Sequence, residues 1–245
     1  MKQFRLLATT LAASLVFFLS SCGSGNEKKT EEKASDSSTV KPAETAPETA
    51  PDKLTNLVII KHKVANFSKW KMDYDEHDPA RRAAGLTNYI LGRGAGKDSN
   101  MVVVMLKAAD MTRAKEFASS TELKDAMQKA GASGSPSISY INVVMNDPSQ
   151  IPQTDRLMVT HKVKDWDAWK KEFDDHKQAR IDAGLIDRGL GYTSGDSHNV
   201  SIVFAITDMA KAKAFIVSKD LKDKMAQAGV EGPPTFFFYN VVQKY

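Results

Sequence analysis

The sequence has almost none of the residues that disulfides and thiolate metal sites require. It contains one cysteine among 245 residues, which excludes an internal disulfide and a cysteine-rich zinc site. It has no His-x-x-x-His pattern and no glutamate–histidine cluster at metal-ligand spacing, so we expect no metal site. It also lacks a strong excess of either charge, with 34 Lys and Arg against 30 Asp and Glu and a net charge of +4. Nucleic-acid-binding domains are usually far more basic, so we expect no nucleic-acid partner.

The one long apolar run lies at the N-terminus. Lys2 and Arg5 precede an apolar stretch at 6–19, which is typical of a signal peptide and short for a transmembrane helix. The sequence Leu-Ser-Ser-Cys that follows resembles the bacterial lipobox, with the only cysteine, Cys22, at the required position. The resemblance implies that residues 1–21 are a lipoprotein signal peptide and that acylated Cys22 binds the lipid bilayer. The alternative is an ordinary secretory signal followed by an incidental cysteine.

We therefore expect a lipid-anchored protein of the bacterial cell envelope. Gly-Ser follows Cys22 in place of the Asp that would indicate retention at the inner membrane, so the outer membrane is favoured. Residues 22–54 contain no aromatic side chain and are rich in Pro, Glu, Ser, Lys and Thr. Such a segment buries too little apolar area to offset its ordering entropy, and it is predicted to be a disordered tether.

The rest of the sequence, after residue 54, contains two copies of one repeat. His-Lys-Val at 62–64 recurs 99 residues later at 161–163, and Ala-Gly-Leu at 84–86 recurs at 183–185. After a one-residue slip, Leu-Lys-Asp at 123–125 recurs 98 residues later at 221–223. The sequence thus predicts two modules, at 55–147 and 155–245, joined by a turn-rich linker.

Each module shows the same order of hydrophobic periods. Strands are predicted at 58–64, 86–91, 101–106 and 138–144, and at 157–163, 185–192, 200–206 and 236–242. One helix is predicted between Asn66 and Gly85, and a second, interrupted near Ser119, between Asp110 and Gly131, with equivalents in the second module. The order β-α-β-β-α-β is that of the ferredoxin-like fold.

The strands are apolar on both faces, as in Val-Val-Val at 102–104 and Phe-Phe-Phe-Tyr at 236–239. Helices cover one face of such a sheet, so the other must be buried as well. The two modules are therefore predicted to pack sheet to sheet as a pseudo-dimeric α+β barrel, and the folded part is expected to be a monomer.

These motifs resemble the dimeric α+β barrel superfamily, especially its antibiotic biosynthesis monooxygenase-like (ABM-like) branch. The resemblance is carried by His-Lys-Val, by Trp-x(6)-His-x(3)-Arg-x(3)-Gly-Leu and by Leu-Lys-Asp-x-Met-x(2)-Ala-Gly. It implies a small-molecule cavity between sheet and helices. Activities in the superfamily range from cofactor-free oxygenation to haem breakdown and isomerisation. No cofactor is expected here, with haem as the alternative.

Two repeated sets of residues are the candidate catalytic or ligand-binding groups. His62 shares a strand face with apolar residues, which suits either acid–base chemistry or a hydrogen-bonded core histidine, and His161 repeats it. On the first predicted helix, a stripe of aromatic, histidine and arginine side chains is typical of a pocket wall in which arginine holds an anionic oxygen. The stripe consists of Trp70, Tyr74, His77 and Arg81, repeated as Trp169, Phe173, His176 and Arg180. Its alternative is a solvated helix face with the arginines packed against Asp75 and Asp174.

Asn142 and Asn240 are secondary candidates, for a ligand carbonyl or for structural hydrogen bonds.

Three functions follow from these residues. The first is a tethered lipoprotein that binds a small apolar or aromatic ligand. The second is a cofactor-independent monooxygenase or isomerase that uses the pocket histidines and arginines. The third is a non-catalytic structural or assembly protein of the envelope.

Overall fold

The computed structural model describes residues 54–245. The predicted signal peptide, Cys22 and the predicted tether up to residue 53 lie outside the described residues. No helix in the described part of the chain is long and apolar enough to cross a membrane.

The two repeats contain the same elements in the same order. The first comprises β1 (Asn56–Val64), α1 (Phe67–Glu76), α2 (Asp78–Ala83), β2 (Leu86–Gly94), a 3-10 turn (Gly96–Asp98), β3 (Met101–Ala108), α3 (Met111–Ala118), α4 (Thr121–Lys129) and β4 (Ala132–Asn146). The second comprises β5 (Asp155–Val163), α5 (Trp166–Asp175), α6 (Lys177–Asp182), β6 (Leu185–Thr193), β7 (Asp196–Ile206), α7 (Met209–Ile216), α8 (Lys219–Gln227) and β8 (Val230–Lys244).

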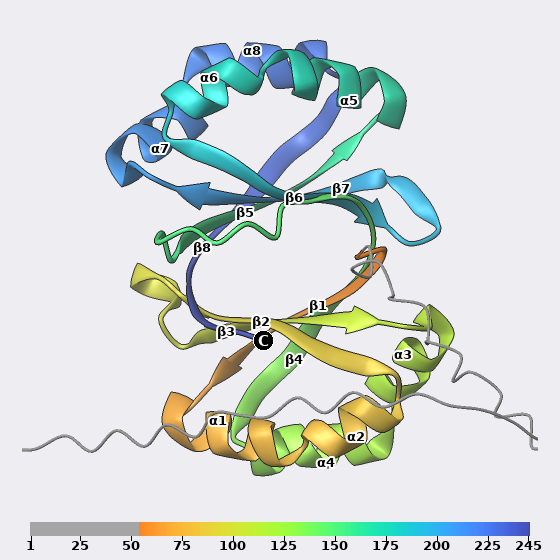
Figure 1. The fold of residues 1–245 in the computed structure, drawn as a ribbon. Helices are drawn as coiled ribbons and strands as arrows, with labels where there is room; N and C mark the ends of the chain where they lie inside the picture. The colour runs from red at the N-terminus through yellow and green to blue at the C-terminus, as the bar shows by residue number, and fades with distance from the viewer. Residues whose placement is uncertain (1–53) are drawn as a thin grey trace, which may run out of the picture. The chain divides into compact units, whose positions relative to one another are not determined.

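The eight strands form one closed antiparallel barrel in the order β1-β3-β2-β8-β5-β7-β6-β4. Each repeat contributes a ferredoxin-like sheet, β4-β1-β3-β2 or β8-β5-β7-β6. Helices α1–α4 cover the outer face of one half and α5–α8 cover the other (Figure 1). The predicted fold, two ferredoxin-like modules packed as a pseudo-dimeric α+β barrel, is confirmed.

The barrel closes where the last strand of each repeat pairs with the second strand of the other, β8 with β2 and β4 with β6. Glycines allow this close approach. A Cβ on Gly92 would lie 2.4 Å from Cδ2 of Tyr239, and a Cβ on Gly191 would lie 2.6 Å from Cγ2 of Ile141. Both seams thus depend on a glycine beneath a large side chain of the neighbouring strand.

The apolar residues divide into three cores that use both faces of the strands. Val102 and Val104 pack outward against the helices of the first repeat, and Leu157 and Val159 do so in the second. Alternate residues point into the barrel and form a core of their own, made of Leu57, Ile59, Val103, Met105, Ile141, Met158, Phe237 and Tyr239. This arrangement accounts for strands that are apolar on both faces.

The helices begin where local side chains can cap them. Asn66 and Asp165 accept hydrogen bonds from the backbone N–H of Lys69 and Ala168, at 3.0 and 2.7 Å. The side chains of Asp110 and Asp208 cap α3 and α7 in the same way. These predicted caps are confirmed, since each is a contact within three residues of sequence.

The prediction of one continuous helix before Gly85 and before Gly184 is wrong, because each is broken at a histidine, His77 or His176. Pro79 accompanies the first break, but the second repeat breaks at the same place without a proline. There, Nη1 of Arg180 donates to the carbonyl oxygen of Phe173 at 2.5 Å. That oxygen would otherwise accept the helical bond four residues on, so the arginine helps to end α5.

The fourth strands are longer than predicted, spanning 132–146 and 230–244 in place of 138–144 and 236–242. Their first residues pair with the end of β1 or β5 beyond a β-bulge, and their last residues pair with β6 or β2 of the other repeat. Inter-repeat pairing therefore extends them past their own sheet.

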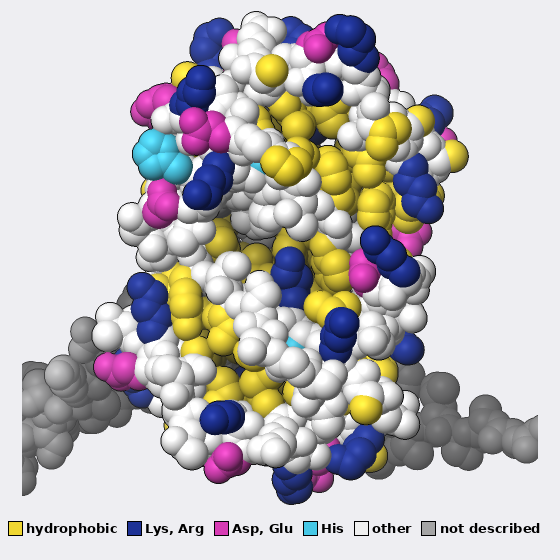
Figure 2. Space-filling view, turned by 180° about the vertical axis from the view of Figure 1, so that it is seen from behind, with side chains coloured by type: hydrophobic (Ala, Val, Ile, Leu, Met, Phe, Trp, Pro, Cys, Tyr) yellow, Lys and Arg dark blue, Asp and Glu magenta, His cyan; other side chains and the backbone are white. Residues whose placement is uncertain are grey.

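On the face seen in Figure 2, Lys and Arg are interspersed with Asp and Glu, and hydrophobic side chains show in hollows between them.

Candidate functional site

A small pocket of about 70 Å³ lies between the sheet and the helices of the first repeat. It contains every site candidate predicted on this repeat's first strand and helices: His62, Trp70, Tyr74, His77 and Arg81. Apart from Asp73, its remaining wall is apolar and includes Phe117, Leu123 and Met127 from α3 and α4. The fold therefore brings together candidates that are up to 19 positions apart in the sequence.

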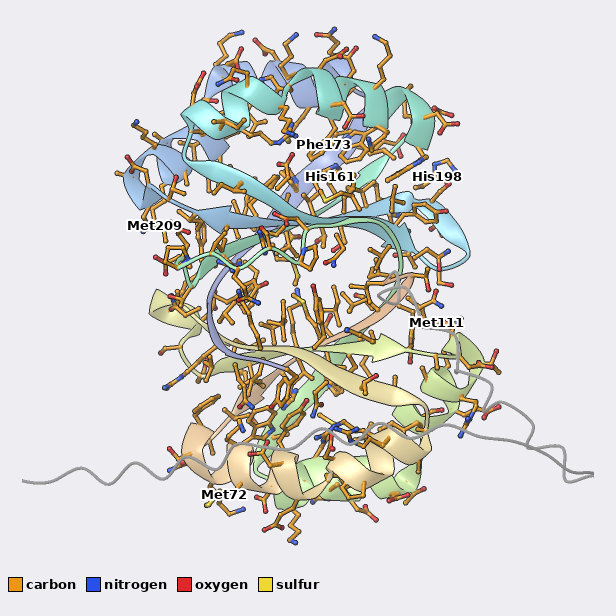
Figure 3. All side chains as sticks on the ribbon, viewed as in Figure 1. Met72, Met111, His161, Phe173, His198 and Met209 are labelled. Atoms are coloured by element: carbon orange, nitrogen blue, oxygen red, sulfur yellow. The ribbon has the colours of Figure 1, made fainter. Side chains whose placement is uncertain are left out.

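The second repeat has an equivalent pocket of about 80 Å³. It is lined by the corresponding residues, His161, Trp169, Phe173, His176 and Arg180. Figure 3 shows His161 on β5 and Phe173 on α5 in the space between the sheet and the helix. The chain thus carries two copies of one small pocket, with Tyr74 of the first replaced by Phe173 in the second.

His62 and His161 are the most unusual polar groups in these pockets. Their side chains are buried, 4% and 9% exposed, and among the described residues neither ring nitrogen of either has a hydrogen-bond partner. Each imidazole packs against a tryptophan, Trp70 or Trp169, with ring centroids 5.5 and 5.4 Å apart. Burial lowers the pKa of both histidines to about 4, so both are neutral at physiological pH.

Arg81 is buried, but its polar atoms point to protein partners. Its Nε donates to Oδ1 of Asn88 at 3.2 Å, and its Nη2 lies 3.4 Å from Oδ1 of Asp78. Its guanidinium also lies 3.8 Å from the ring centroid of Tyr74, whose hydroxyl donates to Oδ1 of Asn88 at 2.6 Å. Burial is the main reason that the pKa of Tyr74 is raised. Arg81 therefore organises the pocket wall.

Arg180 is held more firmly. It donates from Nε and Nη2 to the two carboxylate oxygens of Asp187, at 2.9 and 2.7 Å. Its guanidinium lies 3.7 Å from the ring centroid of Phe173. With Nη1 bonded to the backbone, all three guanidinium nitrogens have a partner, which leaves no evident group to hold a ligand anion.

The predicted alternative partners of the arginines are wrong. Asp75 pairs with Lys71 and Asp174 with Lys170, both on the exposed side of the helix. Arg81 and Arg180 turn to the opposite, buried side, where residues of β2 and β6 accept their hydrogen bonds. Sequence reasoning missed Asn88 and Asp187, although the repeat itself marks them as equivalent polar positions on β2 and β6.

His77 and His176 lie at the helix breaks, at the edges of the pockets. Nε2 of His77 is 3.8 Å from Oε1 of Glu122, and Nε2 of His176 is 3.4 Å from Oδ2 of Asp220. Burial, followed by the charge of Arg81, lowers the pKa of His77, while Glu122 acts in the opposite direction. Both histidines thus face α4 or α8, and Nε2 of His77 is also buried without a hydrogen-bond partner among the described residues.

Asn142 and Asn240 are not brought to the pockets. Neither lines them, and the side-chain amide of Asn240 donates to the carboxylate of Asp155. The structure thus groups ten of the twelve pocket candidates into two sites and leaves the asparagines apart.

No family model matches the chain, and no curated protein matches it. Solved structures share its fold. A proposed monooxygenase from Fusobacterium nucleatum subsp. nucleatum ATCC 25586 superposes with a TM-score of 0.51 at 14% identity, over 79% of this chain and 94% of that one. An anthrone oxidase-like protein gives a TM-score of 0.53 at 12% identity, also over 79% and 94%. At these identities the likeness shows a shared ferredoxin-like barrel fold and nothing more.

A third structure is described as a haem-binding protein from Thermus thermophilus, with a TM-score of 0.45 at 13% identity over 77% of this chain and 92% of that one. Sites that bind small molecules usually have volumes of roughly 300–1,000 Å³, and haem is one of the larger molecules such sites hold. The pockets of about 70 and 80 Å³ are too small to hold haem unless the helices move away from the sheet. The residues 54–245 also contain no group of three or more His, Cys, Asp or Glu side chains that could hold a metal ion.

Proposed function

We propose that this chain is a membrane-tethered envelope lipoprotein that binds small apolar or aromatic molecules in its two pockets between sheet and helices. The observation that carries this proposal is the pair of buried imidazoles, His62 and His161. Each lies among mostly apolar pocket residues without a hydrogen-bond partner among the described residues. A buried polar group left without a partner costs roughly 1–3 kcal/mol, and a ligand that bonds to it recovers part of this cost.

The chemistry of the pockets defines the ligand class. A neutral imidazole offers one N–H donor and one acceptor, which suits a hydroxyl or carbonyl group on an uncharged ligand. The aromatic rings of Trp70 and Trp169 suit a flat apolar body. Met127 and Met225 line the two pockets, and their flexible side chains can shift to admit a body the size of a phenol ring.

Cofactor-independent oxygenation or isomerisation is the alternative, and the fold shared with a proposed monooxygenase and an anthrone oxidase-like protein supports it. The electrostatics favour binding. A general base works best when its pKa is near the working pH, and burial holds the pKa of His62 and His161 at about 4. In the second pocket, all three guanidinium nitrogens of Arg180 also have protein partners, so that arginine offers no free donor to an enolate.

The ligand proposal is tested with 4-fluorophenol and fluorobenzene, followed by ¹⁹F NMR on the chain carrying Cys22→Ala. We expect 4-fluorophenol to bind at two sites and more tightly than fluorobenzene, because only the phenol bonds to the imidazole. His62→Leu/His161→Leu should remove that preference while keeping the pockets apolar. Absence of binding, or a preference that survives in the double variant, would contradict the proposal and favour a structural role.

Oxygen uptake with the same phenol separates the enzyme from the binder. Binding without oxygen consumption or a new product supports the binding protein, whereas turnover that is lost in His62→Leu/His161→Leu supports the oxygenase.

Membrane attachment is tested in cells by labelling with a palmitate analogue. We expect the label on the wild-type chain in the membrane fraction and neither label nor attachment for Cys22→Ala.

A further inference from the structure

The barrel itself has a cavity that is separate from the two pockets. A cavity of about 260 Å³ opens at the barrel end where β1 and β5 begin and β4 and β8 finish. Its inner wall is apolar and comes from both repeats, with Leu57, Ile59 and Met105 from one and Leu190 and Val203 from the other. It is thus continuous with the core inside the barrel and separate from the space between sheet and helices.

Positive charge surrounds this cavity. Lys107, Arg156, Arg188 and Lys244 line it, and Asp147 is the one carboxylate side chain in its wall. Asp147 is already paired with Arg188 at 2.5 Å. The charges of Arg156 and Arg188, after burial, lower the pKa of Lys244. The wall therefore carries several cations that no neighbouring carboxylate neutralises.

Arg156 is the clearest example of a cation in this wall without an ion-pair partner. Its side chain is 2% exposed, and among the described residues no carboxylate lies within ion-pair distance of it. Its Nη1 donates to the carbonyl oxygens of Gln153 and Asp155, both at 2.9 Å. The carboxylate of the adjacent Asp155 accepts from Asn240, and burial lowers the pKa of Arg156 by more than the charge of Asp155 raises it. A buried guanidinium without an anionic partner is costly, and an anion in the cavity would supply that partner.

The repeat shows that the fold does not require these charges. The positions equivalent to the four cations hold uncharged residues in the other repeat: Leu57 for Arg156, Tyr89 for Arg188, Ala205 for Lys107 and Asn146 for Lys244. Both halves build the same barrel, so the charge excess is a property of this cavity.

We propose that the barrel cavity binds a small organic monocarboxylate, with its carboxylate at Arg156 and its apolar chain along Leu57, Ile59 and Val203. The volume, just below the usual range for small-molecule sites, suits a medium-chain fatty acid of about eight carbons. This site is independent of the two pockets that contain His62 and His161, and it selects an anion where they select a neutral molecule.

Octanoate is the probe, titrated calorimetrically into the full chain carrying Cys22→Ala, with 1-octanol as the uncharged control. We expect octanoate to bind once per chain, and Arg156→Met to weaken it about tenfold or more, because a charge-assisted contact is lost. 1-Octanol should not distinguish Arg156→Met from its parent. Lys162→Met, a charge removal at the other end of the barrel, is the matched control and should leave octanoate affinity unchanged.

Thermal unfolding of each variant shows whether it is folded. If Arg156→Met does not fold, Lys107→Met/Lys244→Met removes two of the other cations, and the same loss of octanoate affinity is expected. Octanoate binding that none of the folded charge variants weakens would overturn the proposal. So would binding at two sites that is lost in His62→Leu/His161→Leu, since the anion would then occupy the other pockets. Loss of phenol binding alone would overturn the proposed function and leave this site standing.

Discussion

Arg180 and Asp187 form a two-pronged ion pair between α6 and β6, with nitrogen–oxygen distances of 2.9 and 2.7 Å. Their side chains are 5% and 15% exposed, so water screens the pair little. In the first repeat, Arg81 meets the amide of Asn88 instead. The strand position thus offers a carboxylate in one repeat and an amide in the other, where Asp78 supplies the anion 3.4 Å from Nη2 of Arg81.

We expect Asp187→Ala to lower the free energy of unfolding by about 3–5 kcal/mol, because it leaves the buried Arg180 without its anion. Asp187→Asn should lose less, since it keeps a hydrogen-bond acceptor for Arg180, but not all of the loss is avoided, because Lys177 stands where the first repeat has Asp78. Urea denaturation of the two variants gives both values. Equal losses would show that an amide cannot replace the carboxylate here.

Acidification should destabilise the fold well above the pKa range of ordinary carboxyl groups. Burial lowers the pKa of His62 and His161 from 6.5 to about 4. Below pH 6.5 these histidines bind protons in the unfolded chain but not in the folded state, so the free energy of unfolding falls until about pH 4. At about 1.4 kcal/mol per pKa unit, the two together contribute several kcal/mol.

Urea midpoints measured between pH 7 and pH 4.5 test this expectation. The midpoint should fall through that range in the wild type and fall less in His62→Leu/His161→Leu. A wild-type midpoint that is the same at pH 7 and pH 5 would refute the buried neutral state of these histidines.

Gly92→Ala should destabilise the barrel by about 1–3 kcal/mol, the usual cost of overpacking. The added Cβ would lie 2.4 Å from Cδ2 of Tyr239 and 2.8 Å from Cγ1 of Val103. Gly189→Ala is the matched control, because its Cβ would meet Val203 at an ordinary 3.7 Å. Thermal unfolding should rank Gly189→Ala at or above the wild type and Gly92→Ala well below it, and the reverse order would contradict the packing at this seam.

The isolated repeats should differ in self-association. A fragment of residues 54–150 would expose the inward face of Leu57, Ile59 and Met105, so we expect it to pair with itself. A pair formed by residues 153–245 would place two copies of Arg156 and two of Arg188 at one barrel end. These like charges repel, so this pair should associate more weakly than the first, and added salt should strengthen it by screening the repulsion. Sedimentation equilibrium measures both, and equal association of the two fragments would contradict this account.

Local signals in the sequence predicted much of the fold. The repeat located both modules, and the caps at Asn66 and Asp165 depend on contacts within three residues. Strands that are apolar on both faces required a second covering layer, which the other module supplies. The caps depend on residues close in sequence. The packing of the modules follows from the need to bury the second apolar face of each sheet.

The remaining features depend on contacts that join different elements of the fold. The helix break at His176 arises where Arg180 on α6 donates back to Phe173 on α5, and the carboxylate partner of Arg180 lies on the following strand, β6. The barrel cavity was missed because its cations come from four strands of both repeats. One signal was present, since Arg156 and Arg188 depart from the repeat at positions where Leu57 and Tyr89 are uncharged.

The seams between β2 and β8 and between β4 and β6 join segments of one polypeptide. Closing the barrel is therefore a unimolecular step, in which each half meets the other at an effective concentration set by the short linker between β4 and β5. An equivalent barrel built from two separate chains comes apart as the protein is diluted. This one keeps its halves together when only a few molecules are present.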